Sequence, residues 1–361
     1  MKELLYRFIC RIIPVYRVCL RWVFRCPNRG VLPPGRLCAV EDPTEGETHG
    51  DIVHPCVRYE NKGGSGRWWM VYTPFYRNDS QLENPRLCFA DEKDGDAPFV
   101  WHFDRFIKER PISGYNSDPT LLIDNGKKYV FWRENYTPLS NHFDCSRITI
   151  GCEVQDESCR YFSSPQLFNA PRHQDREVCP TFLPVSEGYR AYAMDIRFCS
   201  PNKYTRPDWQ SRLLARLSSL ANVLFFYDSQ KCFGVSLWDS PTLEGPFSYS
   251  KTVRFTGVHP LFHPWHMDLF ETEGLLYAVV QTNKNNGDVY LAYSKDRESF
   301  RFFKKPLVTS RDAGGGIYKP SALVVNGVFY LFYTRKESAH SPLNQMFVSS
   351  INWGCLLKQQ K

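Results

Sequence analysis

The stretch Glu177-Val178-Cys179-Pro180-Thr181-Phe182 has the pattern of a β-strand with a carboxylate at its entry. It is followed by a glycine turn at Glu187-Gly188 and then by the apolar, aromatic run Tyr189–Met194. Two such runs joined by a short glycine turn predict a β-hairpin. The same hairpin pattern recurs in the rest of the chain.

Four other segments have the same layout of strand, glycine turn and aromatic-rich strand. Their turn glycines are Gly66, Gly126, Gly274 and Gly327. With Gly188 included, successive turns lie 60, 62, 86 and 53 residues apart. One supersecondary unit repeated at a near-constant period indicates a radial repeat architecture. The sequence therefore predicts an all-β protein, a five-bladed β-propeller.

Two segments fall outside this repeat, and they set the expected domain boundaries. Residues 1–30 are expected to form a basic amphipathic helix and a linker, and residues 31–361 the propeller. The longest step between turns contains Asp208, a helix-capping residue, followed by leucines at helical spacing, which predicts one inserted helix at about 207–227. Residues 37–40 are expected to supply a strand that closes the last blade, because rings protect their edges by closure.

The N-terminal segment carries much of the net charge of +7, with arginines interrupting its apolar residues. A spanning helix needs roughly 20 predominantly apolar residues, so this pattern favours a helix lying on a membrane surface through residues 1–26. The alternative is a helix packed on the propeller or on a partner protein. Because the basic charge is local, a nucleic-acid partner is not expected.

The 13 cysteines include no C-x-x-C pair, and several lie in apolar strand patterns. Reduced core thiols of this kind predict a cytoplasmic protein, peripheral on the inner face of the membrane if the N-terminal helix binds there. No metal site is predicted. No cofactor is predicted either, because the chain has neither a phosphate-binding loop of the P-loop type nor a dinucleotide-binding fingerprint.

The chemistry is expected at the propeller axis, where the first strands of all blades begin and converge on one mouth. Ionisable or polar groups occupy every one of these entries. They are Asp51, His54, Asp118, Glu177, His266, Asp268, Tyr318 and Lys319. The far ends of second strands border the same mouth and add Arg133, Asp195 and Arg197.

Three of these carboxylates, Asp51, Asp118 and Glu177, suit glycosidic chemistry. Such a reaction needs an ionised carboxylate as base or nucleophile, and a protonated one to donate to the leaving oxygen. Candidates for stacking on a sugar, with packing between blades as the alternative, are Trp68, Trp69, Tyr72, Trp132 and Trp265. The predicted substrate-binding set consists of His54, Tyr72, Glu83, Asn84, Arg133, Asp195, Arg197, Trp265, His266, Asp268, Tyr318 and Lys319.

Several motifs, one or more in each predicted blade, carry a resemblance to a known superfamily. They are His54-Pro55-Cys56-Val57, Trp69-Met70-Val71-Tyr72-Thr73-Pro74, Glu83-Asn84-Pro85, Asn116-Ser117-Asp118-Pro119, Glu177-Val178-Cys179-Pro180, Pro264-Trp265-His266-Met267-Asp268 and Tyr318-Lys319-Pro320. The chain resembles the five-bladed β-propeller glycoside hydrolases of families 43, 32 and 68. It is most similar to family-43-like proteins associated with bacterial surface-polysaccharide genes.

The resemblance implies roles for three residues. A first-blade Asp would be base or nucleophile, a second-blade Asp, here Asp118, would adjust pKa values, and a third-blade Glu, here Glu177, would be the general acid. The chain departs from the pattern in two places. His54, not Asp, precedes Pro55, which leaves Asp51 as the nearest carboxylate, and Glu177 lies three residues before its proline where the family has two.

The expected function is a carbohydrate-active enzyme that cleaves or transfers a glycosyl unit of an oligosaccharide or polysaccharide, in bacterial capsular or surface-polysaccharide metabolism. Two alternatives stay open. Arg133, Arg197, His266 and Lys319 would suit a phosphorylase or glycosyltransferase that holds a phosphate. The missing first-blade Asp would suit a non-catalytic sugar-binding scaffold.

Overall fold

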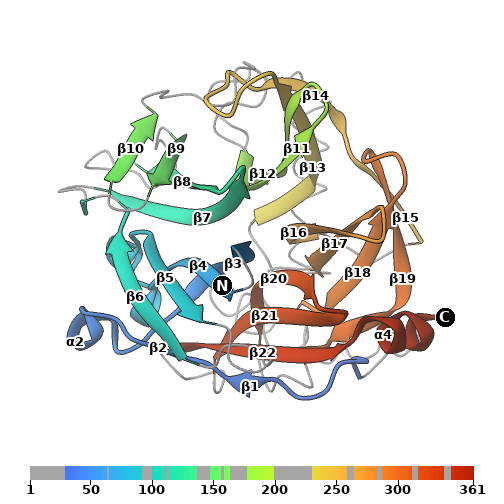
Figure 1. The fold of residues 1–361 in the computed structure, drawn as a ribbon, viewed down its shortest axis with the longest axis horizontal. Helices are drawn as coiled ribbons and strands as arrows, with labels where there is room; N and C mark the ends of the chain where they lie inside the picture. The colour runs from blue at the N-terminus through green and yellow to red at the C-terminus, as the bar shows by residue number, and fades with distance from the viewer. Residues whose placement is uncertain are drawn as a thin grey trace, which may run out of the picture.

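Five sheets are arranged around a common axis in the computed structural model of the chain (Figure 1). Each of the five predicted hairpins lies in a different sheet, and the all-β propeller class is confirmed. The structure describes residues 29–62, 65–91, 100–107, 109–110, 114–135, 147–155, 158–162, 177–198, 230–257, 264–282, 287–310, 316–336 and 343–361.

The first three sheets follow the chain from the axis outward. The first consists of β3 (Val53–Lys62), β4 (Ser65–Thr73), β5 (Arg86–Asp91), β6 (Val100–Phe106) and the short β2 (Ala39–Val40). The second consists of β7 (Tyr115–Asp124), β8 (Lys127–Asn135), β9 (Arg147–Gln155) and β10 (Ser158–Phe162). The third consists of β11 (Glu177–Val185), β12 (Gly188–Phe198), β13 (Gln230–Ser240) and β14 (Ser248–Thr252).

The last two sheets repeat the arrangement. The fourth consists of β16 (Pro264–Thr272), β17 (Leu275–Thr282), β18 (Val289–Ser294), β19 (Ser299–Val308) and β15 (Arg254–Thr256). The fifth consists of β20 (Ile317–Val325), β21 (Val328–Lys336), β22 (Asn344–Asn352) and β1 (Arg36–Leu37). The described helices are short: α2 (Glu45–Thr48), the 3-10 turns η1 (Tyr76–Asn78) and η2 (Ser80–Leu82), and the C-terminal α4 (Trp353–Gln360).

The ring is closed by the segment that the sequence predicted for this role. β1 pairs with β22 in the fifth sheet, and β2, two residues later, pairs with β6 in the first sheet. The N-terminal segment therefore completes one sheet and starts the next. This link between the fifth and first sheets closes the ring.

Large aromatic side chains fill the spaces between neighbouring sheets. Trp68, for example, packs edge-on against Tyr330 and Phe332 of the fifth sheet, with ring centroids 5.1 and 6.0 Å apart. Tyr72 belongs to the same buried cluster: it is 0% exposed, and its hydroxyl donates to Asp42 Oδ2 at 2.7 Å. The structure thus places Tyr72 in the core, not at a sugar site.

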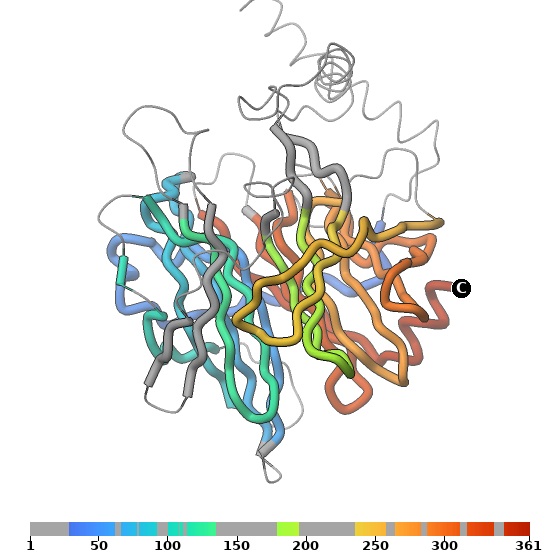
Figure 2. The backbone as a smooth tube through the Cα atoms, turned by 90° about the horizontal axis from the view of Figure 1, so that it is seen from above, coloured from blue at the N-terminus to red at the C-terminus, as the bar shows by residue number. Residues whose placement is uncertain are grey.

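In side view the strands run along the axis, and hairpin turns such as the lime β11–β12 turn and the red β20–β21 turn lie at one end (Figure 2). The entries of the first strands therefore lie at the opposite end. The predicted helices at residues 1–26 and about 207–227 lie outside the described residues. Within the described part of the chain, no helix is both long enough and apolar enough to span a membrane.

Candidate axial site

A repeated backbone irregularity places side chains at the axis. In four sheets the first strand carries a residue with positive φ directly before a proline: His54 (57°), Asp118 (53°), Cys179 (50°) and Lys319 (34°). The strand register shifts at each of these positions. Positive φ is unfavourable for residues other than glycine, so its fourfold recurrence marks a constraint of the fold and not a local accident.

These four residues contact one another or one another's strands across the axis. His54 Nε2 lies 3.1 Å from Asp118 Oδ1, and Cys179 Sγ lies 3.0 Å from the same oxygen. Lys319 Nζ donates to the carbonyl oxygen of Pro119 at 2.8 Å. All four are buried. The bulges therefore bring together side chains from the first, second, third and fifth sheets.

Asp118 is the centre of this cluster, because each of its two oxygens contacts two donors. Oδ1 contacts His54 Nε2 and Cys179 Sγ, while Oδ2 forms an ion pair with Arg133 Nη2 at 2.8 Å and accepts from Ser117 Oγ at 3.4 Å. Burial alone would raise the pKa of Asp118, but the charges of Arg133 and His54 hold it well below its usual range. Asp118 is thus a fixed, ionised carboxylate.

The position of Arg133 follows from strand register. Ser117 and Arg133 are paired opposite each other on β7 and β8, so the guanidinium reaches both Ser117 Oγ, at 3.0 and 3.2 Å, and Asp118. Arg133 is half-buried, unlike the groups deeper in the cluster. It is therefore a polar group of the cluster that solvent can still reach.

His54 is held on both ring nitrogens. Nδ1 lies 3.0 Å from Thr73 Oγ1 and 3.4 Å from Glu83 Oε2, while Nε2 contacts Asp118 and the hydroxyl of Tyr318 at 3.2 Å. The imidazole thus stands between two carboxyl groups. It occupies the first-strand position where the resemblance leads one to expect an aspartate.

Glu83 reaches the cluster from a loop between η2 and β5. The second sheet holds this loop, because Asn116 N donates to the Glu83 carbonyl at 3.1 Å and Asn116 Nδ2 donates to Asn84 Oδ1 at 2.8 Å. Burial raises the pKa of Glu83, and the nearby His54 opposes this only in part. Asp118 and Glu83, on either side of one imidazole, therefore have pKa values shifted in opposite directions.

Aromatic rings line the fourth and fifth sheets beside His54. Tyr318 packs at 5.2 Å from the His54 ring and edge-on at 4.7 Å from His266, which in turn meets Trp265 at 5.8 Å. His266 and Trp265 are buried, whereas Tyr318 is half-buried. Burial and the Asp118 charge raise the pKa of Tyr318, so its hydroxyl stays neutral.

One layer deeper along the same strands, Asp268 closes the axis. Arg58 donates to both of its oxygens at 3.0 and 2.7 Å, Ser321 Oγ donates at 2.6 Å and Thr181 Oγ1 at 3.4 Å. These partners come from the first, third and fifth sheets, so the cluster joins four sheets with that of Asp268 itself. Burial would raise the pKa of Asp268, but Arg58 lowers it. The structure therefore gives Asp268 a structural role, and its contact with a substrate stays a prediction.

Asp51 also lies outside the axial cluster. It is 0% exposed; Oδ1 accepts from Phe75 N, and Oδ2 accepts from the backbone and side-chain amides of Asn344 at 2.8 and 2.9 Å. These bonds tie the start of the first sheet to the start of β22. The predicted catalytic carboxylate is thus engaged in ring closure.

For Glu177, Asp195 and Arg197 the structure describes the backbone only. Glu177 is paired with Asp195 at the end of the β11–β12 hairpin that holds Cys179, and Arg197 follows on β12. Their backbone lies at the end of the third sheet where β11 begins, on the side of the axial cluster.

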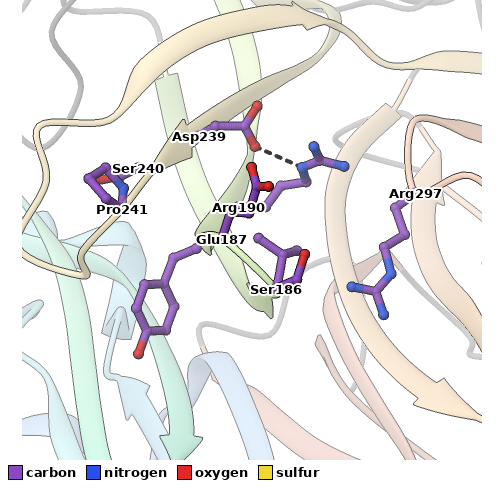
Figure 3. A pocket seen from close by; sticks show the side chains of 9 residues that line it. Ser186, Glu187, Arg190, Asp239, Ser240, Pro241 and Arg297 are labelled. Carbon is purple, nitrogen blue, oxygen red and sulfur yellow. Dashed lines mark hydrogen bonds and ion pairs between the residues drawn. The ribbon is translucent and has the colours of Figure 1, made fainter.

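A separate pocket of ≈ 490 Å³ lies at the opposite end of the third sheet, around the β11–β12 turn (Figure 3). Its arginines are engaged: Arg190 Nε donates to Asp239 at 2.8 Å and Arg297 Nη2 to Glu271 at 2.6 Å. The pocket is therefore lined by paired charges and does not belong to the axial cluster.

Thr73, Ser117 and Arg58 are axial residues that the sequence-based set does not contain. The residue before each first-strand proline was a usable signal, and it also marks Cys179. Nothing in the sequence marks Arg58. In the described part of the chain, no three His, Cys, Asp or Glu side chains are arranged to hold a metal ion.

Comparison with known proteins adds a fold-level likeness. No family model matches the chain, and no curated protein matches it by sequence. Among solved structures, an N-acetylgalactosamine deacetylase from F. plautii in complex with blood group B trisaccharide has a TM-score of 0.60 at 14% identity, covering 89% of this chain and 95% of that one.

Glycoside hydrolases are also similar in structure. The GH43_1 enzyme from Xanthomonas citri, solved with xylose, has a TM-score of 0.54 at 12% identity, with 89% and 90% coverage. A family 117 glycoside hydrolase from Zobellia galactanivorans has a TM-score of 0.51 at 13% identity, with 88% of both chains covered. At such identities the likeness shows a shared fold alone.

Proposed function

We propose that the chain is a carbohydrate-active enzyme that cleaves or transfers a glycosyl unit at the axial site. The observation that carries this is Asp118, a buried carboxylate that Arg133 and His54 hold ionised at the axis, with the backbone of Glu177 at the entry of the neighbouring third sheet. Glycosidic chemistry uses carboxyl groups whose surroundings separate their protonation states. The structural neighbours, two of them named as glycoside hydrolases and one solved with a trisaccharide, are consistent with a sugar ligand on this fold.

The proposed roles follow from the contacts. Ionised Asp118 offsets the positive charge that develops on the sugar ring, while Arg133 and Tyr318 meet hydroxyl groups of the ligand, since both are half-buried. Glu177 is the proposed general acid, because its strand enters the axis two residues before Cys179, which contacts Asp118.

The first-strand position holds His54 and not a carboxylate. In this proposal the attacking group is therefore supplied from outside the protein, by water or by an acceptor molecule. A phosphate acceptor is the second candidate. Arg133 and Lys319 outnumber the ionised Asp118 among the described side chains of the cluster, so the local charge favours an anion.

The test is turnover of an oligosaccharide panel by the full-length protein, with and without inorganic phosphate, read by chromatography. Asp118→Asn is expected to lower turnover at least about 100-fold, whereas Asp91→Asn, in an exposed ion pair of the first sheet, should leave it unchanged. Products only with phosphate would identify a phosphorylase. Binding without product over long incubation would contradict enzymatic function and favour a scaffold.

Three further expectations remain predictions: contact of residues 1–26 with a membrane surface, a cytoplasmic location, and a role in bacterial surface polysaccharide. Sedimentation of the full chain with anionic vesicles, compared with neutral ones, would test the first. If the protein stays in the supernatant with both, a partner or the propeller itself is the better candidate for that segment.

A further inference from the structure

Glu83 belongs to the axial cluster but lies in a loop and not on a strand. Its carboxyl is 4% exposed and lies 3.4 Å from His54 Nδ1 and 3.5 Å from Thr73 Oγ1. The loop that carries it is fixed from both sides: Glu83 N donates to Ser80 O at 3.0 Å, and Asn116 N donates to Glu83 O at 3.1 Å. The carboxyl group is therefore held in place beside the imidazole, and the protons of the two groups depend on each other.

The protons can be assigned by counting donors and acceptors. An ionised carboxylate only accepts, so the 3.1 Å contact between Asp118 Oδ1 and His54 Nε2 requires a hydrogen on Nε2. Nδ1 is then the variable nitrogen. Thr73 Oγ1 either donates or accepts, so it fits both protonation states of Nδ1.

Glu83 and Nδ1 are linked by the Thr73 hydroxyl, which lies 3.0 Å from Nδ1 and 3.5 Å from Glu83 Oε2, and this link needs one further proton that either end can hold. A protonated Glu83 donates to the hydroxyl, which donates to a bare Nδ1. An ionised Glu83 accepts from the hydroxyl, which accepts from a protonated Nδ1. Burial favours the neutral carboxyl, which is the direction of the shift at Glu83.

We infer that Glu83 is a positioning residue for His54, and that the two hold a single proton in common through the Thr73 hydroxyl, which lies between Oε2 and Nδ1. The pair then carries no net charge in either arrangement. It keeps Nε2 protonated and directed at Asp118, which holds that carboxylate ionised in the axial site. The inference concerns the same site as the proposed function, although its test needs no substrate.

Other charged or titratable groups also face His54, and their effects on its ring have to be distinguished from that of Glu83. Asp118 with Arg133 comes from the second sheet, His266 from the fourth at 6.0 Å between rings, and Tyr318 from the fifth. Lys319 acts on Asp118 from the fifth sheet. Among the titratable groups that the structure describes, only Glu83 lies on the Nδ1 side, so a change at Glu83 should alter the Nδ1 signal in particular.

The experiment is ¹⁵N–¹H spectroscopy of the histidine rings in the full-length protein, as a function of pH. His54→Gln assigns the His54 signals. In the wild type, the Nδ1 shift is expected to lie between those of bare and protonated nitrogen while Nε2 stays protonated. Glu83→Gln should abolish the intermediate Nδ1 shift, because the amide cannot take up the proton.

The matched control is Glu60→Gln. Glu60 is another carboxylate of the first sheet with low exposure, 3.4 Å from Lys128 Nζ, and its carboxyl oxygen also accepts from Trp69 Nε1 at 3.2 Å. This substitution should leave the Nδ1 and Nε2 shifts of His54 as they are in the wild type. An equal effect of both substitutions, or none from Glu83→Gln, would overturn the inference.

If Glu83→Gln does not fold, Glu83→Asp keeps the carboxyl but withdraws it from Nδ1, and the same loss of the intermediate shift is expected. The two proposals can fail separately. A shared-proton signal without turnover of any oligosaccharide would leave the Glu83–His54 pair standing and remove the enzymatic function. Turnover with an ordinary Nδ1 signal would do the reverse.

Discussion

Arg58 and Asp268 join the first sheet to the fourth across the propeller axis, with two parallel hydrogen bonds of 3.0 and 2.7 Å. The pair lies one layer below His54 and His266, and Ser321 and Thr181 complete its hydrogen bonds from the fifth and third sheets. It therefore forms the floor of the axial site. Its energetic weight can be measured independently of any ligand.

Arg58→Ala leaves the buried Asp268 carboxylate without its counter-ion, so we expect a loss of about 3–5 kcal/mol in the free energy of unfolding. Urea denaturation measures this. The control is Arg67→Ala in the same sheet, whose pair with Asp91 is exposed (46% for the Arg67 side chain) and should contribute less than about 1 kcal/mol. Equal losses for the two variants would mean that the floor is not a stabilising element.

Gly188 and Gly274 occupy equivalent turns but differ in their surroundings. At Gly188 (φ 129°) an added Cβ would overlap the carbonyl oxygen of Ser240, whereas at Gly274 (φ 74°) nothing lies within 4 Å. Gly274→Ala should therefore lower the free energy of unfolding by about 1 kcal/mol, because alanine is less stable than glycine in the left-handed backbone conformation. Gly188→Ala should cost clearly more, because backbone has to move. Thermal unfolding of both variants decides; a larger loss at Gly274 would contradict this account.

Asp118 should contribute pH-dependent stability. Its pKa in the folded protein lies well below the ordinary value of about 3.9, so the contribution is fully present above about pH 4 and is lost as the pH falls further. The stability difference between wild type and Asp118→Asn should therefore shrink between about pH 5 and pH 2.5. Denaturant melts at several pH values measure it.

In the same experiment, the contribution of Glu83 to stability should change with pH in the opposite direction. Because its pKa in the folded protein is raised, the folded state binds the proton more tightly, and stability increases as the pH falls toward the ordinary value of about 4.3. The difference between wild type and Glu83→Gln should therefore grow on acidification. The same trend for both variants would show that the two carboxyl groups are not separated as described.

Asp51→Asn distinguishes a structural carboxylate from a catalytic one. The variant places an amide donor among three N–H donors from Phe75 and Asn344, so we expect a loss of about 2–4 kcal/mol in unfolding free energy. Ligand binding by the remaining folded protein should be unchanged. A stable variant that has lost turnover would instead return Asp51 to the catalytic group.

The fold was predictable because its signals are local and repeated. Each hairpin carries its own glycine turn and aromatic strand, and five copies reinforce one interpretation. The closing role of residues 37–40 followed from the need to cover strand edges. These inferences required no knowledge of which side chains meet.

The site was only partly predictable, for a physical reason. His54, Asp118 and Lys319 stood out because each precedes a first-strand proline, and the structure brings them together at the axis. Asp51 and Asp268 have equally suggestive positions, but their oxygens are already bonded to partners from distant sheets. Sequence position shows that a carboxylate is near the axis, not whether its hydrogen bonds are already taken.

Closing the ring joins two segments that the ribosome makes at very different times. Arg36 pairs with Val348, so the strand that completes the fifth sheet is among the first described parts to leave the ribosome, and its partner is among the last. The early segment must wait for nearly the whole chain before it finds its place. Individual hairpins, built from neighbouring residues, face no such delay. The propeller can therefore gain much of its secondary structure during translation, while its final closure is a late, long-range event.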